Sequence, residues 1–315
     1  MRRNIFVHIE LETPERARLE GELPDDALFY FRQDMPEKEW PHIFNTSHIC
    51  FGNPPPEWIG KDCTLQWLQL ESAGFGEYLG LPGDLPLKIT NLKGMFGTPV
   101  AETAVAGILG IFRGMNELTL LQKEKIWKGL LLRPSLRTIH GSKACIIGGG
   151  SIGLTIKKIL KGCGAKVVVM GKRSPDADIR TARELELELT RTDMVISCLP
   201  ETPETIGYFD RHRLDLLPKN AVFVNVGRGS AVDEEHLIEK LQNGQLAGAV
   251  LDVTDKEPLP SDHPLWECPN TILTQHTGGG YNMENMDKIT IFLSNYKRFI
   301  QGQELINLVS LEKGY

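Results

Sequence analysis

The chain has 315 residues, enough for two domains, and its hydrophobic fraction of 41% and charged fraction of 24% are ordinary for a folded globular protein. Lys and Arg together number 35 and Asp and Glu together number 41, so the formal net charge is −6. This acidic balance argues against a nucleic acid or an anionic membrane as a partner, and no apolar run is long enough to span a bilayer.

The first residues are basic, but the apolar stretch that follows them is too short for a signal peptide, so we interpret 4–7 as a first strand. The six cysteines form no C-x-x-C pair, which removes the usual zinc and thioredoxin-like signatures, and we expect no bound metal. Three cysteines lie in apolar runs, where a reduced cysteine acts as a small hydrophobe: Cys50, Cys145 and Cys198. We therefore expect a cytoplasmic protein.

Short apolar runs broken by Pro and Gly fill residues 1–94, as in a small α/β domain with short helices. From Thr98 one long helical pattern extends to about Leu121, with Pro99 suited to its first turn. A last helical pattern runs from Glu284 to about Leu305. We predict a substrate domain formed by 1–94 and 285–315, and a dinucleotide-binding domain formed by 95–284.

Between the two long helical patterns, strands that are apolar almost throughout alternate with helices, which predicts a doubly wound parallel sheet. The predicted strands are 144–147, 167–170, 194–198, 221–226, 247–253 and 271–274. The expected fold class is α/β, with two Rossmann-like or flavodoxin-like domains that each contain a parallel sheet, and a cleft between them.

A glycine loop follows the first of these strands. Residues 148–153 form a G-x-G-x-x-G pattern between a strand and a helix, and the helix N-terminus offers free N–H groups to phosphates. The three glycines permit a tight turn, close approach of a pyrophosphate, and close packing of helix on strand. The alternative is a tight turn that needs glycine for its geometry alone. The expected cofactor-binding residues here are Gly148, Gly150, Ser151, Ile152 and Gly153.

The end of the second strand indicates which dinucleotide binds. An NAD site places Asp or Glu there for the ribose 2′-OH, whereas this chain has Gly171 followed by Lys172, Arg173 and Ser174. Two cations and a hydroxyl suit a 2′-phosphate. We expect NADP, as NADPH, to be the preferred cofactor, with NAD possible. The alternative is an ordinary basic surface turn.

Three polar segments follow later strands, at the sheet edge where open α/β sheets bind ligands. They carry Arg228 between two glycines, Glu257 before a proline, and His276. Here the chain resembles the D-isomer-specific 2-hydroxyacid dehydrogenases, and among them the glyoxylate/hydroxypyruvate reductase branch. The resemblance covers nearly the whole chain and rests on Val-Ala-Glu at 100–102, the glycine loop, Leu-Pro-x-Thr-Pro-Glu-Thr at 199–205, and the order Arg, Glu, His.

The reduction of a 2-keto acid needs these residue types. A guanidinium can clamp an anion and polarise a carbonyl, which suits Arg228. An imidazole changes its charge near neutral pH, so His276 suits the role of acid and base, and Glu257 would hold the ring and favour its protonated form. Each residue taken alone has a plainer explanation, as a surface arginine, a loop acid or a capping histidine.

The resemblance also implies a substrate loop, in which the backbone N–H groups of Ala73 and Gly74 would bind the carboxylate. We expect Phe75 and Tyr78 to form apolar walls beside it. Residues 68–85 contain no Lys or Arg, so a phosphorylated substrate would be poorly matched. The expected substrates are therefore small unphosphorylated 2-keto or 2-hydroxy acids.

Four more cofactor contacts follow from the resemblance: Leu199, Pro200, Thr205 and Asp252. Asp252 would meet the nicotinamide carboxamide, and its alternative role is to cap a nearby backbone N–H. Residues 102–139 are similar to the dimer arm of the family, which implies a homodimer.

Other functions remain open from the sequence. A phosphoglycerate dehydrogenase would share the same site residues, and an NAD(H)-sensing corepressor of this fold would keep the nucleotide site without being an enzyme. A formate dehydrogenase is a weaker alternative, because that branch has Gln at the position of Glu257. The residues favour a reductase acting on a glyoxylate-like or hydroxypyruvate-like substrate.

Overall fold

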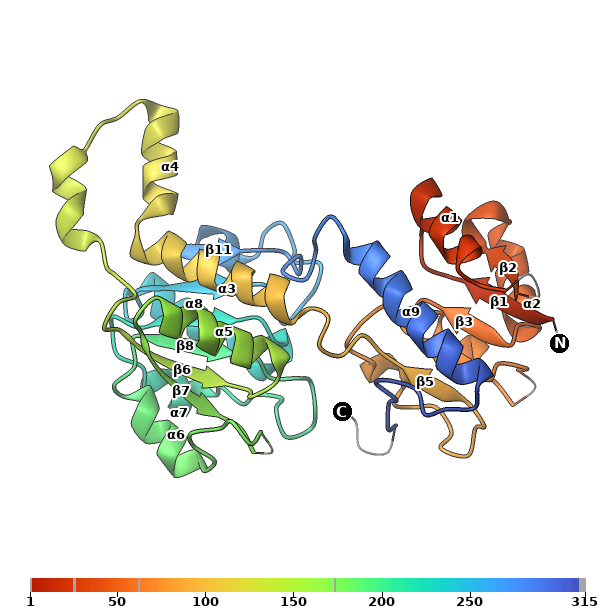
Figure 1. The fold of residues 1–315 in the computed structure, drawn as a ribbon. Coiled ribbons are helices and arrows are strands. Elements are labelled where there is room, and N and C mark those ends of the chain that lie inside the picture. The colour runs from red at the N-terminus through yellow and green to blue at the C-terminus, as the bar shows by residue number, and fades with distance from the viewer. Residues whose placement is uncertain (1, 25–26, 62, 173, 312–315) are drawn as a thin grey trace. The chain divides into compact units, whose positions relative to one another are not determined.

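The computed structural model describes residues 2–24, 27–61, 63–172 and 174–311. The chain forms two compact units, a first unit of residues 1–95 and 281–315 and a second unit of residues 96–280 (Figure 1). The sequence placed the two boundaries at 94/95 and 284/285. Each unit is built on its own parallel sheet, so the predicted α/β fold class is confirmed.

The first unit contains a five-stranded sheet with the strand order β2-β1-β3-β4-β5, and every neighbouring pair is parallel. Its strands are β1 (Arg3–Val7), β2 (Ala27–Phe31), β3 (Ile49–Phe51), β4 (Trp67–Gln69) and β5 (Lys88–Thr90). Its α-helices are α1 (Thr13–Gly21), α2 (Trp40–Asn45) and α9 (Glu284–Ile300).

Two apolar layers cover the two faces of this sheet. Successive side chains of a strand point to opposite faces, so each strand contributes to both layers. On one face, Ile5 and Val7 lie in a core with Phe292 of α9, whose ring stacks on Trp67 at a centroid distance of 5.0 Å. On the other face, Phe6 lies in a second core. The helix α9 ends at Ile300, so the expectation that it reached about 305 is wrong; Gly302, at φ +67°, turns the chain away.

The second unit contains a six-stranded parallel sheet with the order β11-β10-β9-β8-β6-β7. Its strands are β6 (Lys143–Ile147), β7 (Lys166–Met170), β8 (Met194–Ser197), β9 (Val222–Asn225), β10 (Gly248–Leu251) and β11 (Thr271–Leu273). Its α-helices are α3 (Gly97–Phe112), α4 (Met115–Glu124), α5 (Ser151–Gly162), α6 (Ala182–Leu189), α7 (Arg211–Asp215) and α8 (Glu234–Gln242).

The helices of the second unit cover both faces of its sheet. One core joins α3 and α5 to the sheet, and a second joins α6, α7 and α8 to the opposite face (Figure 1). The central strands are buried on both faces, which explains why their sequences are apolar almost throughout. The carboxyl ends of these parallel strands meet at one edge of the sheet. The predicted catalytic residues Arg228, Glu257 and His276 each follow a strand at this edge.

The long helix predicted for 98–121 is two helices, α3 and α4, separated at Arg113 and Gly114. Gly114 adopts φ +62°, a left-handed conformation that interrupts the helix, and the two axes are bent by 65°. Within the described residues no single helix is long and apolar enough to cross a membrane. The bent pair α3–α4, taken together, has the length and the apolar composition of a span.

Candidate active site

The glycine loop between β6 and α5 contains glycines with different physical roles. Gly148 adopts φ +117°, and a Cβ there would lie 2.8 Å from the carbonyl oxygen of Cys198. A Cβ at Gly153 would collide with the carbonyl oxygen of Gly148, which shows how closely helix and loop pack. A Cβ at Gly150 would meet no atom within 4 Å. The backbone at Gly150 therefore faces open space, as an approaching pyrophosphate requires.

The N-terminus of α5 suits an anion. Gly150 is its N-cap and brings no side-chain oxygen to the first turn. The first N–H groups of a helix have no partner inside the helix, so those of Ser151 and Ile152 remain available at the positive end of its dipole. The residues present therefore fit the diphosphate of a dinucleotide.

The segment that follows β7 carries the residues expected to select the dinucleotide; Arg173 lies outside the described residues. Ser174 packs against the glycine loop, since a Cβ placed on Gly149 would lie 2.5 Å from the Cβ of Ser174. The Ser174 hydroxyl is buried and has no partner among the described residues. A buried hydroxyl without a partner costs free energy unless a ligand satisfies it.

Lys172, by contrast, already has a partner. Its ammonium lies 2.7 Å from a carboxylate oxygen of Glu204, and both side chains are exposed. An exposed ion pair contributes little stability, so the ammonium can exchange this partner for a phosphate at small cost.

The motif at 199–205 forms a turn beyond β8 that is stabilised by hydrogen bonds within the motif. The Thr205 hydroxyl donates to the carbonyl oxygen of Pro200 at 2.6 Å and lies 2.9 Å from the backbone nitrogen of Thr202, which donates to it. Thr205 therefore stabilises the turn, while Leu199 and Pro200 continue directly from the strand end beside Gly148. Burial raises the pKa of the neighbouring Cys198 thiol to about 12, which keeps it protonated.

Arg228 lies on the turn after β9. The buried side chain of Asn225 spans this turn, accepting from the Gly227 N–H at 3.1 Å and donating to the Arg228 carbonyl at 2.9 Å. A Cβ at Gly229 would collide with the carbonyl group of Thr254, so this turn packs directly on the loop after β10. The two contacts fix the backbone of this turn at the sheet edge, and the guanidinium of the partly buried Arg228 donates to the Gly227 carbonyl at 2.7 Å.

Glu257 and His276 come together at this edge. A Glu257 carboxylate oxygen lies 2.6 Å from Nδ1 of His276, and the other oxygen accepts from the Thr254 N–H at 3.1 Å. Both Gln275 and His276 have left-handed backbones, with φ of +55° and +56°. Such conformations cost free energy in residues other than glycine and are often kept at functional sites.

Asp252 holds the His276 loop in place. Its buried carboxylate accepts from the Thr274 hydroxyl at 2.6 Å and from the Gly278 N–H at 3.0 Å, and its carbonyl accepts from the His276 N–H at 2.6 Å. This is the capping role that the sequence left as an alternative. The contact between Asp252 and a nicotinamide carboxamide stays a prediction.

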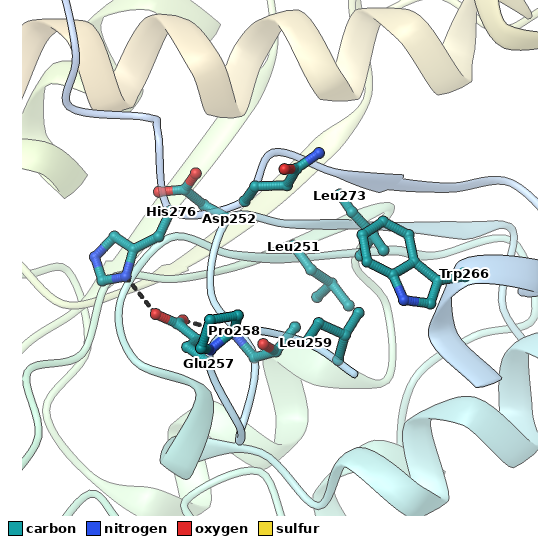
Figure 2. A pocket seen from close by; sticks show the side chains of 10 residues that line it. Leu251, Asp252, Glu257, Pro258, Leu259, Trp266, Leu273 and His276 are labelled. Carbon is teal, nitrogen blue, oxygen red and sulfur yellow. Dashed lines mark hydrogen bonds and ion pairs between the residues drawn. The ribbon is translucent and has the colours of Figure 1, made fainter. Parts of the chain in front are cut away.

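A cavity of about 420 Å³ adjoins the Glu257–His276 pair (Figure 2). The imidazole and the carboxylate lie at one end, and Trp266 and Leu273 lie toward the other. The remaining lining residues are Leu251, Asp252, Thr254, Pro258, Leu259 and Gln275. Arg228 does not line this cavity.

Ala73 and Gly74 lie in the first unit, on the loop after β4, where Ala73 is exposed. Phe75 and Tyr78, which we expected to wall a substrate pocket, are instead buried in the core of that unit. The Tyr78 hydroxyl donates to the Pro54 carbonyl at 2.8 Å. The expectation of apolar walls from these two residues is therefore wrong.

Sequence reasoning did not assign roles to Asn225, Thr254 or Gly229. An Asn at a strand end, two residues before a glycine, is a signal for a side-chain-supported turn and could have indicated Asn225. The contacts of Thr254 and Gly229 join loops that are distant in sequence, and no local pattern marks them.

Comparison with known proteins identifies the family of the chain. Residues 105–278 match the model of the D-isomer specific 2-hydroxyacid dehydrogenase NAD binding domain. Glyoxylate/hydroxypyruvate reductase A of Yersinia enterocolitica is 30% identical over 275 residues, which cover 83% of this chain and 85% of that protein.

Solved structures share the fold. A D-isomer specific 2-hydroxyacid dehydrogenase family protein from Aeromonas salmonicida has a TM-score of 0.87 and 28% identity, over 99% of this chain and 100% of that one. An NADPH-dependent glyoxylate/hydroxypyruvate reductase from Sinorhizobium meliloti, solved with NADP and sulfate, has a TM-score of 0.81 and 23% identity, over 100% of both chains. The resemblance seen in the sequence is confirmed, and the chain belongs to the D-isomer specific 2-hydroxyacid dehydrogenase family of NAD(P)-dependent oxidoreductases.

Proposed function

We propose that this dehydrogenase reduces a small unphosphorylated 2-keto acid, of the glyoxylate or hydroxypyruvate type, to the D-2-hydroxy acid, and that it prefers NADPH to NADH. The observation that carries the proposal is the 2.6 Å contact between Glu257 and Nδ1 of His276, on the loops that follow two adjacent strands. A carboxylate that orients an imidazole is the arrangement expected of a proton donor.

Each residue has a defined task in this proposal. His276 would donate a proton from Nε2 to the forming alkoxide, since Nδ1 faces Glu257. Arg228 would polarise the keto group with its permanent charge. The Ala73 and Gly74 amides would bind the carboxylate. When bound, the nicotinamide supplies the hydride.

The preference for NADPH is supported by the segment after β7. Gly171 brings no carboxylate that would repel a 2′-phosphate, Lys172 brings an ammonium, and the buried Ser174 hydroxyl lacks a partner among the described residues. Changing Gly171 to Asp should shift the preference toward NADH, because a carboxylate would then oppose the phosphate. Equal or better kcat/KM with NADH in the unmodified enzyme contradicts this part of the proposal.

The preference for an unphosphorylated substrate is supported by the charges around the substrate loop. That loop carries Glu71, and the buried ammonium of Lys288 lies 3.6 Å from the Glu71 carboxylate and 2.7 Å from that of Glu284. Two carboxylates already compensate this ammonium, so it is poorly suited to bind a further phosphate.

The decisive experiment measures oxidation of NADPH and NADH with glyoxylate, hydroxypyruvate and 3-phosphohydroxypyruvate. The expected result is turnover with NADPH and a larger kcat/KM for the unphosphorylated acids. A larger kcat/KM for the phosphorylated acid would support a phosphoglycerate dehydrogenase. Binding of NADPH without turnover of any keto acid would support a corepressor-like binding protein.

A further inference from the structure

The loop after β4 has three consecutive carbonyl groups that are all engaged by the protein. The Ser72 carbonyl accepts from the Leu92 N–H at 3.0 Å, and the Ala73 carbonyl accepts from the Asn91 side-chain amide at 2.7 Å. The Gly74 carbonyl accepts from the Ser72 hydroxyl at 2.6 Å. Three successive peptide units are therefore held in fixed orientations.

Fixing these carbonyls also fixes the N–H groups that follow them. In a planar trans peptide unit the C=O and the N–H point in opposite directions. The N–H groups of Ala73, Gly74 and Phe75 are thus directed away from the donors that hold the carbonyls. None of the described residues accepts a hydrogen bond from these three N–H groups. Three oriented donors on one short loop suit an anion with several lone pairs, such as a carboxylate.

The two side chains that hold the carbonyls are themselves held by hydrogen bonds. Asn53, after β3, donates to the Ser72 hydroxyl at 3.1 Å and accepts from the Glu71 N–H at 3.0 Å. Asn91, after β5, is buried and accepts from the Lys93 N–H at 3.1 Å. The strands β3 and β5 flank β4 in the sheet, so the loop is supported from both sides.

We propose that Ser72 and Asn91 are positioning residues for the substrate carboxylate. Asn91 orients the Gly74 N–H and Ser72 orients the Phe75 N–H, which makes Phe75 a third donor beside Ala73 and Gly74. This inference rests on the proposed function, because it assigns the anion to the carboxylate of a 2-keto acid. Neither side chain needs to touch the substrate.

The test compares Ser72→Ala, Ser72→Thr and Asn91→Ala with the wild-type enzyme. Ser72→Ala removes the hydroxyl that holds the Gly74 carbonyl, whereas Ser72→Thr retains one. Loss of one oriented donor to a charged group should raise the KM for glyoxylate about tenfold. It should weaken the binding of oxamate, used as an analogue of the 2-keto acid, by a similar factor. The kcat and the KM for NADPH should stay near the wild-type values.

A matched control is Thr64→Val at the opposite end of β4. The Thr64 hydroxyl donates to the carbonyls of Asn45 and Ser47, so this change also removes a bond from a hydroxyl to the backbone of the first unit. It should lower the melting temperature without changing the KM for glyoxylate. A similar rise in KM in this control would indicate general destabilisation and overturn the inference.

The remaining outcomes separate the inference from the proposed function. An active Ser72→Ala enzyme with unchanged KM and unchanged oxamate affinity overturns the inference alone, and so does a Ser72→Thr enzyme as impaired as Ser72→Ala. If Ser72→Ala does not fold, Asn91→Ala gives the same comparison. A wild-type enzyme that reduces no 2-keto acid overturns the proposed function and this inference with it.

Discussion

Glu257 and His276 are 19 residues apart in sequence, yet the Glu257 carboxylate lies 2.6 Å from the Nδ1 atom of His276. The second oxygen of the carboxylate accepts from the Thr254 N–H, so both carboxylate oxygens have a hydrogen-bond partner. This arrangement assigns Nδ1 to the carboxylate, and in the proposed reaction Nε2 is the atom that exchanges the proton. The pair therefore gives the most direct test of the proposed chemistry.

The first prediction is that Glu257→Gln lowers kcat by about 10²-fold or more, within the usual range for disturbing acid–base catalysis. Glutamine retains the shape of the side chain but removes the carboxylate charge that lies beside the imidazole. Steady-state reduction of glyoxylate with NADPH measures the effect. The matched control is Asp255→Asn, which removes an exposed charge from the same loop and should leave kcat near wild type. An undiminished kcat in Glu257→Gln would show that this charge is not needed.

The second prediction concerns the close approach at Gly229. A Cβ there would collide with the Thr254 carbonyl, so Gly229→Ala must separate the loops that carry Arg228 and Glu257. The expected cost is about 1–3 kcal/mol in the free energy of unfolding, with a clear loss of kcat because Arg228 is displaced. Urea unfolding and steady-state kinetics measure the two effects.

The control for this substitution is Gly162→Ala in α5, where a Cβ would meet no atom within 4 Å. This change should be neutral or slightly stabilising, since alanine reduces the entropy of the unfolded chain. If both variants behave alike, the contact between Gly229 and Thr254 does not determine the spacing of the two loops.

The third prediction is a pH-dependent stability that involves His236, a buried residue of α8 that contacts one carboxylate from α7 and one from α8. Its Nε2 lies 2.8 Å from Asp215 and its Nδ1 lies 2.9 Å from Glu239. Hydrogen bonding to His236 is the main cause that lowers the pKa of both carboxyls, with smaller contributions from Lys240 and Arg211. Both ring nitrogens can donate to carboxylates when the imidazole carries two protons.

The sign of the effect follows from these lowered pKa values. A carboxyl whose pKa is lower in the folded state contributes stability above its usual pKa, about 4, and loses it as the pH falls through the folded-state value. The free energy of unfolding of the wild type should therefore fall as the pH drops below about 4, and His236→Gln should reduce this dependence. His212→Gln, which removes an exposed histidine 4.0 Å from Glu186, should leave the dependence unchanged in the same urea titrations.

The fourth prediction concerns the oligomer implied by the family resemblance. Three apolar side chains that follow α4 are largely exposed: Trp127 (95%), Leu130 (73%) and Leu131 (82%). Such a group of exposed apolar side chains is unusual on the surface of a monomer. We expect a homodimer, and the double change Leu130→Glu and Leu131→Glu should produce monomers in sedimentation velocity. Leu187→Glu changes a 60% exposed leucine on α6 and should leave the dimer intact. A monomeric wild-type protein would contradict the prediction.

Much of the fold was predictable because local patterns express it. The apolar runs from Ala144 onward predicted the strands of the second sheet, since strands covered on both faces have few polar positions. The glycine loop predicted its own place between β6 and α5. The order of Arg228, Glu257 and His276, together with the motifs at 100–102, 148–153 and 199–205, carried the resemblance to the family. Each of the three residues follows a strand, at the edge where parallel sheets gather functional residues.

The tertiary structure decided what depends on contacts between distant residues. The helix predicted for 98–121 breaks at Gly114, although its apolar pattern continues. Phe75 and Tyr78 enter a core rather than a pocket, because whether an apolar side chain meets solvent or other side chains depends on the rest of the chain. Asp252 caps the His276 loop, and Asn91 orients a peptide that it does not adjoin in sequence. A sequence can specify which groups are present, but hydrogen-bond partners are determined by the positions that the folded backbone gives to both groups.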